Sequence, residues 1–287
     1  MTRWVTIVVR AVLALLLWNA ADVTTAYAEE RTKKAALVQA EERDTKAVPT
    51  GEDSWVELEL RGWAPSLRGT VQSSATNMVG TNLSLGDTLG VDTSRQFVWP
   101  KASLHFAKNH RIWASYLDMQ YSGDKTLTQT ITFGGNTFNV ADSVHSELGF
   151  KEIAGGYQYD WLKFSKFASN LNLQVHYLDI NAKLRSNVVG TISESIKAPI
   201  PTIGGGIQIW PVDWLKLHGD FNIFKLGVAG FKGEMIDSQA ALTVSPWEWL
   251  GASVGYRYYR IIARDTKSDD RADWLQHGPY VSVMVRF

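Results

Sequence analysis

The sequence contains no cysteine among its 287 residues. This absence excludes disulfide bridges, thiolate metal sites and cysteine nucleophiles. It also suits an exported protein that stays unfolded, without thiol pairing, until it inserts into a membrane. An excess of one charge is lacking as well, because 29 Lys and Arg residues balance 29 Asp and Glu residues. No basic block or nucleic-acid-binding motif is present, so nucleic acid is excluded as a partner.

Long apolar runs are missing from the rest of the chain after the N-terminal region. No segment there reaches the 18 or so consecutive apolar residues that indicate a transmembrane helix. Residues 1–28 differ from the rest. They carry an apolar run, 5–17, which only Thr6 and Arg10 interrupt, and a small-residue cleavage site that ends at Ala28. A membrane anchor would need about 20 uninterrupted apolar residues. The pattern therefore predicts a secretory signal peptide that is cleaved after Ala28.

The mature chain divides into a short leader and one domain. Residues 29–53 are mostly charged and polar, and such a composition favours a flexible periplasmic leader. A short helix around Lys34–Arg43 is the alternative. Residues 54–287 have the length of a single barrel domain.

From residue 54 onward, apolar and polar residues alternate with a period of two, which is the signature of β-strands. Within Trp214–Phe224, for example, Leu215 and Leu217 share one face while Lys216 and His218 share the other. The alternation predicts an all-β chain with ten strands, at residues 54–73, 95–107, 110–133, 137–160, 168–185, 190–210, 214–229, 233–246, 249–264 and 273–287.

The lengths of the connections distinguish a membrane barrel from a soluble sandwich. A sandwich packs its apolar face inward, whereas a barrel turns that face to lipid and lines its lumen with the polar face. The predicted connections Lys108-Asn109, Pro211–Asp213 and Pro246–Glu248 are tight, while 74–94, at the opposite end, is the longest. Short periplasmic turns and longer outer loops are typical of inserted barrels.

Aromatic placement and the C-terminus favour the same interpretation. An aromatic girdle is expected at the headgroup level of a barrel, and five tryptophans sit at the short-turn end: Trp161, Trp210, Trp214, Trp247 and Trp249. The chain stops at Phe287, with Val281, Val283 and Val285 on the same face. This strand resembles the terminal strand of bacterial outer-membrane barrels, which ends on Phe and is recognised by the assembly machinery. The resemblance makes Phe287, Val285 and Val283 the expected assembly signal.

The architecture of residues 54–287 resembles that of small outer-membrane barrels of the OmpA, OmpX and OmpW kind. The resemblance implies an antiparallel up-and-down transmembrane β-barrel of about ten strands, with eight to twelve as the range. It also implies an outer-membrane location, with outer-membrane lipid and the barrel assembly machinery as partners. No residue-level motif of one subfamily is present, so no functional residues carry over.

A barrel of ten strands encloses little space, and small barrels fill it with side chains. The charged and titratable residues expected to point into the lumen are Glu57, Glu59, Arg61, Lys101, Asp118, Lys216, His218, Asp220, Arg257 and Arg286. Five of them are expected near mid-height, namely Arg61, Lys101, Asp118, Asp220 and Arg257. Charges in a confined space must be paired or hydrated. Two interpretations remain, a salt-bridged structural plug and a polar path that conducts ions or a small solute.

One predicted hairpin is longer than a membrane requires. Its strands, 110–133 and 137–160, meet at Gly134-Gly135-Asn136, a favourable hairpin turn. Strands of about 24 residues rise roughly 60 Å at a tilt near 40°, against an apolar band of about 25 Å. The outer half is therefore expected to stand clear of the membrane, with Thr126, Thr128, Thr130 and Thr132 on a water-exposed surface.

The sequence shows no closed catalytic or metal-binding constellation. His145-Ser146-Glu147 has the residue types of a hydrolase, but neighbours in a strand point to opposite faces, which leaves His145 without a nucleophile. The six histidines lack metal-ligand spacing. We predict a non-enzymatic barrel without metal or cofactor, in a structural or surface-interaction role. The alternative is a narrow pore for ions or a small solute, and a lipid hydrolase is third. The expected ligand is thus a small solute or a surface ligand.

Overall fold

The computed structural model describes residues 49–74, 80–228, 231–265 and 270–287. The predicted signal peptide and all of the leader before residue 49 lie outside these ranges. Within them, no helix is long and apolar enough to cross a membrane.

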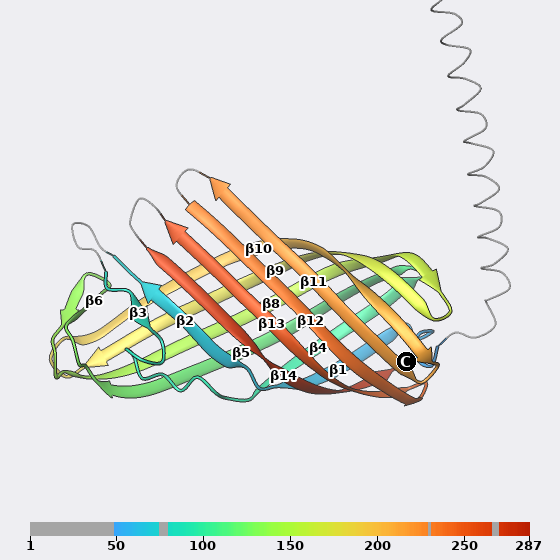
Figure 1. Cartoon of the computed structure of the whole chain (residues 1–287), viewed down its shortest axis with the longest axis horizontal. Coiled ribbons are helices and arrows are strands. Elements are labelled where there is room, and N and C mark those ends of the chain that lie inside the picture. The colour runs from blue at the N-terminus through green and yellow to red at the C-terminus, as the bar shows by residue number, and fades with distance from the viewer. Residues whose placement is uncertain (1–48, 75–79, 229–230, 266–269) are drawn as a thin grey trace, which may run out of the picture. The chain divides into compact units, whose positions relative to one another are not determined.

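Ten long antiparallel strands form a closed ring (Figure 1). The order around the ring is β1-β4-β5-β8-β9-β10-β11-β12-β13-β14, and pairing of β1 with β14 closes it. β2 follows β1 after a break at Ala64-Pro65 and pairs with the outer part of β14. The all-β, ten-stranded barrel predicted from the alternation is therefore confirmed. The ring strands and β2 span Val56–Trp63 (β1), Ser66–Gln72 (β2), Phe97–Ala107 (β4), His110–Thr126 (β5), Ser143–Phe164 (β8), Phe167–Ser186 (β9), Gly190–Val212 (β10), Leu215–Val228 (β11), Phe231–Trp247 (β12), Leu250–Asp265 (β13) and Arg271–Arg286 (β14).

The two ends of the barrel differ in their connections. At the end that carries the C-terminus, two-residue turns join β4 to β5, β8 to β9, β10 to β11 and β12 to β13. The described parts of the longest connections, 73–96 and 127–142, lie at the opposite end and contain the short strands β3 (Leu83–Ser84), β6 (Ile131–Phe133) and β7 (Asn136–Phe138). By the rule for inserted barrels, the short-turn end faces the periplasm and the long loops face outward.

Strand β9 shows how the chain distributes its side chains. Leu171, Leu173 and Val175 are about half exposed on the outside of the barrel, whereas Asn172 and Gln174 between them are buried inside. A soluble sandwich would bury the apolar face instead. The outside-apolar pattern is the one that a lipid environment stabilises.

The predicted long hairpin is interrupted. β5 ends at Thr126, and β6 and β7 form a separate two-stranded hairpin. Its turn is the predicted one, since Gly134 and Gly135 both adopt positive φ angles of 53° and 73°, as a type I′ turn requires. Thr126, Thr128 and Thr130 are exposed and Thr132 is half-buried.

The physical reason for the interruption lies on the other face of this segment. Leu127, Ile131, Phe133 and Phe138 are all at most 3% exposed and join the apolar core. An upright hairpin would leave these side chains in water. The segment instead folds over the outer end of the barrel and buries them.

Candidate functional site

Residues that precede β1 lie against the strands at the short-turn end of the lumen. The N–H of Thr50 donates to the carbonyl of Asp213 over 3.0 Å, which anchors this segment to the β10–β11 turn. The Glu52 carboxylate accepts a hydrogen bond from Lys216 Nζ at 2.8 Å and lies 3.8 Å from Arg111 Nη2. Burial alone would raise the pKa of Glu52, but Lys216 and Arg111 lower it to about 2. The structure thus brings residues 49–53, the end of the predicted leader, into the barrel mouth.

Replacing Glu52 with glutamine is expected to lower the free energy of unfolding near neutral pH by about 2 kcal/mol, since Lys216 loses a buried charged partner. A carboxylate whose pKa is lowered on folding stabilises the protein above its unfolded value and loses that effect as the pH falls through the folded value. The difference between wild type and E52Q should therefore shrink as the pH falls from 4.5 toward 2. Urea titrations in detergent micelles, followed by tryptophan fluorescence, measure this difference.

Glu248, exposed in the β12–β13 turn at the same end, supplies the matched control. We expect E248Q to leave the unfolding midpoint unchanged at every pH. A difference between wild type and E52Q that stayed constant from pH 7 to pH 2 would contradict the role assigned to the Glu52 carboxylate.

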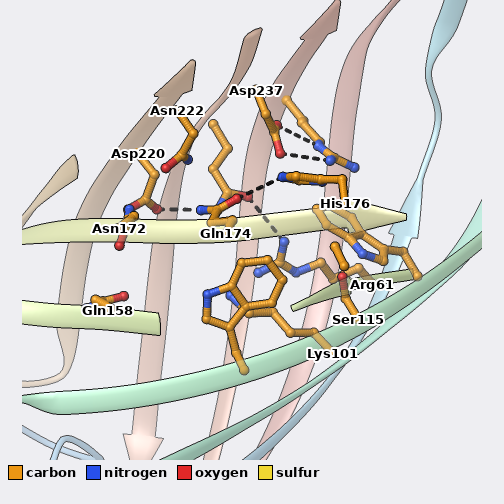
Figure 2. A pocket seen from close by; sticks show the side chains of 15 residues that line it. Arg61, Lys101, Ser115, Gln158, Asn172, Gln174, His176, Asp220, Asn222 and Asp237 are labelled. Carbon is orange, nitrogen blue, oxygen red and sulfur yellow. Dashed lines mark hydrogen bonds and ion pairs between the residues drawn. The ribbon is translucent and has the colours of Figure 1, made fainter. Parts of the chain in front are cut away.

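A polar cavity of about 40 Å³ lies at mid-lumen, and Figure 2 shows the side chains that surround it. Lys101 lines this cavity with its ammonium nitrogen 4.9 Å from the centre of the Trp113 ring. No ion pair of Lys101 occurs in the part of the chain that the structure describes. At about 10–15 Å³ for each water, the cavity has room for about three water molecules.

Arg61 and Asp220 form another part of the cavity wall. Arg61 binds Glu59 at 2.7 Å and donates to Gln239 at 3.2 Å. Asp220 accepts hydrogen bonds from Asn172 at 3.4 Å and from Gln239 at 3.3 Å. Four of the five residues predicted near mid-height, Arg61, Lys101, Asp220 and Arg257, line this one cavity.

Several buried polar atoms at the cavity have no hydrogen-bond partner among the described residues. They are Arg61 Nε, Asn172 Oδ1, Asn222 Oδ1 and Arg257 Nη1. In folded proteins such atoms are satisfied by ordered water. The arrangement therefore suits a hydrated chamber whose walls are pinned by charge pairs.

Toward the outer end, Arg257 holds the next cluster of charges. Its guanidinium donates two hydrogen bonds of 2.9 Å to Asp237 and lies 3.5 Å from Glu152. Glu152 also contacts His176 Nδ1 at 2.5 Å and accepts from the Tyr259 hydroxyl at 3.2 Å. All of these groups except Asp237 are at most 2% exposed. This is a continuous network across four strands, β8, β9, β12 and β13.

Above this network the interior becomes apolar. Met119, Tyr121, Phe150 and Trp274 are buried, and the rings of Phe150 and Trp274 stack with their centres 5.5 Å apart. The outer loops and the β6–β7 hairpin then add Leu83, Leu85, Leu89, Val91, Leu127, Ile131, Phe133 and Phe138 to the same core. We call these eight residues the outer cap. The described residues thus fill the lumen with charge at the short-turn end and with apolar side chains at the outer end.

Nine of the ten residues predicted for the lumen point inward, and the prediction for Asp118 is wrong. On β5 the inward residues are Ser115, Leu117 and Met119, which are buried, while Asp118 points outward and lies 3.6 Å from Lys151. The apolar residues of this strand face the apolar core rather than lipid. The outward position of Asp118 follows from that.

Asp118 belongs to a row of alternating charges on the outer surface. It pairs in register with Lys151, which pairs with Asp179, which pairs with Lys197, across β5, β8, β9 and β10. Lys197 and Asp179 lie 3.1 Å apart. We call this row the charge ladder. On β8, ten residues separate Lys151 from Trp161, which corresponds to about 25 Å along the barrel axis and matches the apolar band of a membrane barrel.

Comparison with known proteins bears on the fold. No model of a known protein family and no curated protein matches the chain. Among solved structures, the outer membrane protease OmpT from Escherichia coli superposes with a TM-score of 0.53 and 8% identity, over 85% of this chain and all of OmpT. The chain has the fold of a bacterial outer-membrane β-barrel. The likeness to OmpT, at this identity, shows a shared fold and no shared activity.

Two further similar barrels have TM-scores below 0.5. The toluene transporter TodX from Pseudomonas putida has a TM-score of 0.35 and 8% identity, over 84% of this chain and 93% of TodX. Ail, the attachment invasion locus protein of Yersinia pestis, has a TM-score of 0.34 and 11% identity, over 79% of this chain and 99% of Ail.

The girdle predicted for this outer-membrane barrel needs one correction. Trp161, Trp214, Trp247 and Trp249 are each more than half exposed at the short-turn end, as expected for rings at the headgroup level. Trp210 is only 3% exposed, because its position on β10 shares the inward face with Gln208. The exposed Trp55, which precedes β1, lies outside the predicted set.

The C-terminal residue completes the closure of the ring. The N–H of Phe287 donates to the carbonyl of Val56 over 2.9 Å, and its side chain is 70% exposed. Val283 is also exposed, and Val285 is half-buried. The recognition of these residues by the assembly machinery remains a prediction.

The residues considered for catalysis do not assemble a site. His145 points outward and lies 2.7 Å from Asp124 and 3.5 Å from Glu147, whereas Ser146 points inward and is buried. No group of three or more His, Asp or Glu residues that could hold a metal occurs in the described ranges.

Proposed function

We propose that this protein is a closed outer-membrane barrel with a structural lumen, and that it acts through its outer strands and loops as a surface-interaction protein. The observation that carries the proposal is the apolar outer half of the interior, which consists of the outer cap and the buried rings below it. A hydrated path along the barrel axis would have to pass the buried rings of Phe133, Phe138 and Phe150, which are 0% exposed.

The charge pairs of the lower lumen support the same function. Glu52, Glu57, Glu59, Glu152 and Asp237 each lie within 4 Å of a basic group. Separating buried pairs of this kind costs several kcal/mol for each unpaired ion. Such a lumen stabilises the barrel. Because each of these acids is already paired with a basic group, none of them is free to bind a cation that passes through.

We expect no steady conductance from the refolded protein in a planar bilayer. Insertion is shown independently by faster gel migration of the unboiled sample and by protease resistance of the barrel. Steady, ion-selective openings from protein that passes both checks would contradict a structural lumen. They would turn attention to Lys101 and Asp220 at the cavity.

A narrow pore for ions or a small solute is the second candidate. The observation that favours it is the mid-lumen cavity, where Lys101 has no ion pair in the described part of the barrel. If the barrel conducts, K101M should reduce anion preference, because it removes the one unpaired ammonium that lines the cavity. If the barrel is closed, K101M should leave the bilayer silent.

A further inference from the structure

The wall of the barrel is split between the outer halves of β10 and β11. β10 pairs with β9 from Gly190 to Ile209, but its pairing with β11 runs only from Ile203 to Val212. β11 continues to Val228 with β12 as its single neighbour. Figure 1 shows the two strands diverging toward the outer end. Within the part of the chain that the structure describes, residues 190–202 therefore form a free β edge.

The direction of the backbone groups along this edge follows from one hydrogen bond. The N–H of Trp210 donates to the carbonyl of Lys166, just before β9, so even-numbered residues of β10 direct their backbone toward β9. The backbone N–H and C=O groups of odd-numbered residues then point toward the split, because the direction of these groups alternates along an antiparallel strand. At Thr191, Ser193, Ser195 and Lys197, the backbone N–H and C=O have no strand partner among the described residues.

Nearer the membrane, two prolines occupy the positions of β10 whose backbone points toward the split. Pro199 and Pro201 are odd-numbered, and both keep their register with β9. An unpaired backbone donor in lipid costs several kcal/mol, and proline has no such donor. Lys197 belongs to the charge ladder, and Ile203, two residues beyond Pro201, is exposed and apolar. Backbone N–H donors that point toward the split are thus absent at Pro199 and Pro201, beside lipid. They are present at residues 191–197, in water.

We propose that residues 191–197 of β10 are a docking edge, to which an extended segment of another polypeptide outside the cell adds as a strand. Strand addition to a free edge is a general mode of peptide recognition, in which main-chain hydrogen bonds supply affinity and alternate side chains supply specificity. The proposal rests on the surface-interaction role proposed above and names the surface that performs it.

The inner face of this edge defines the chemistry of the segment. Glu194 is exposed and makes no ion pair in the described structure, and Ile196 is 59% exposed. Ile192 is partly buried against the core. Directly opposite side chains interact across antiparallel strands. The segment should therefore carry a basic residue opposite Glu194, with apolar residues two positions away on either side.

Other occupants fit the edge less well. In two copies within one membrane, β10 runs toward the periplasm in both, so the two edges cannot pair antiparallel. A lipid chain cannot accept or donate the hydrogen bonds that Thr191, Ser193 and Ser195 offer. An extended segment of a different chain satisfies both the backbone groups and Glu194.

The test compares Ser195→Pro with Ser195→Ala in the full-length protein, refolded in detergent micelles. The probe is a fluorescein-labelled heptapeptide, Thr-Val-Thr-Lys-Thr-Val-Thr, and the readout is fluorescence anisotropy. We expect saturable binding by wild type, binding about tenfold weaker with S195P, and binding within about twofold of wild type with S195A, since only proline removes the N–H and blocks the edge. The barrel should accept the proline as it accepts Pro199 and Pro201, and unboiled gel migration checks its folding.

A second measurement does not depend on the protein variant. The same peptide with N-methyl groups on alternate residues should lose binding to wild type, because its own edge is blocked. The proposal is overturned if wild type shows no saturable binding, or if S195P or the methylated peptide binds as tightly as its parent. A concentration-dependent dimer that S195P abolishes would instead assign the edge to self-association and overturn the proposal. The two proposals are tested separately. Steady conductance in a bilayer would contradict the closed barrel with a surface-interaction role, whereas absent peptide binding would contradict only the docking edge.

Discussion

Replacing Arg257 with methionine should lower the free energy of unfolding by about 3–5 kcal/mol, because it leaves two acids, Glu152 and Asp237, without a counter-charge. Arg257 is 2% exposed and binds Asp237 through two hydrogen bonds of 2.9 Å. Its guanidinium also lies over the rings of Trp99 and Tyr259, at 4.2 and 4.5 Å. Methionine preserves much of this packing volume, so the loss reports mainly on charge. Urea unfolding in detergent micelles measures the effect.

Arg260, three residues along the same strand, is the matched control. It binds Asp273 through two hydrogen bonds of 3.2 and 2.8 Å, but its side chain is 37% exposed on the outer face. Exposed pairs contribute about 1 kcal/mol or less, so R260M should change stability little. Neutralising the acids as well, in R257M/E152Q/D237N, should recover much of the loss from R257M. Equal effects of R257M and R260M would show that the inner network does not hold the barrel together.

The sequence predicts the short-turn half of the barrel well, because the two faces of each strand there meet different surroundings. Lipid outside and charge inside give a clear alternation, so Arg257 and Arg286 are placed correctly from their neighbours alone. Asp237 carries the same signal, since it shares a face with Gln239 along a predicted strand.

The prediction fails where the interior changes character along a strand. On β5 the inward residues pass from Ser115, beside the cavity, to Leu117 and Met119 in the apolar core. A rule that assigns apolar faces to lipid inverts this strand and places Asp118 in the lumen. The prediction of Trp210 as a girdle residue is wrong for a related reason, because the sequence does not distinguish a tryptophan inside the barrel from one in the girdle.

Glu52 illustrates a different limit. Nothing in its polar surroundings distinguishes it from the leader before it. Its burial depends on Lys216 from β11 and Arg111 from β5, which the closed ring brings to the same mouth. Lys216 is 164 positions from Glu52 in the sequence, and Arg111 is 59 positions away. These contacts arise from the closed ring and not from any local sequence pattern.

Replacing Phe133 with alanine should release the outer cap and cost about 3–5 kcal/mol of local stability, as expected for a large buried aromatic side chain. Phe133 is 0% exposed and belongs to a hairpin of only two short strands, β6 and β7. A hairpin of this size is at best marginally stable by itself, so its order depends on the side chains that it buries. Loss of one anchor should therefore open the segment 127–142 while the ten-stranded ring stays folded.

Hydrogen exchange with mass spectrometry tests this prediction region by region. We expect F133A to exchange much faster over residues 127–142 and unchanged over β9. Thr128→Ala, on the exposed face of the same segment, should exchange like wild type throughout. Bilayers containing F133A should remain silent, because Phe150, Trp274 and the Arg257 network still close the lumen below. Conductance that appears on loss of Phe133 alone would make the cap the sole seal, and the rest of the interior would then be a hydrated channel.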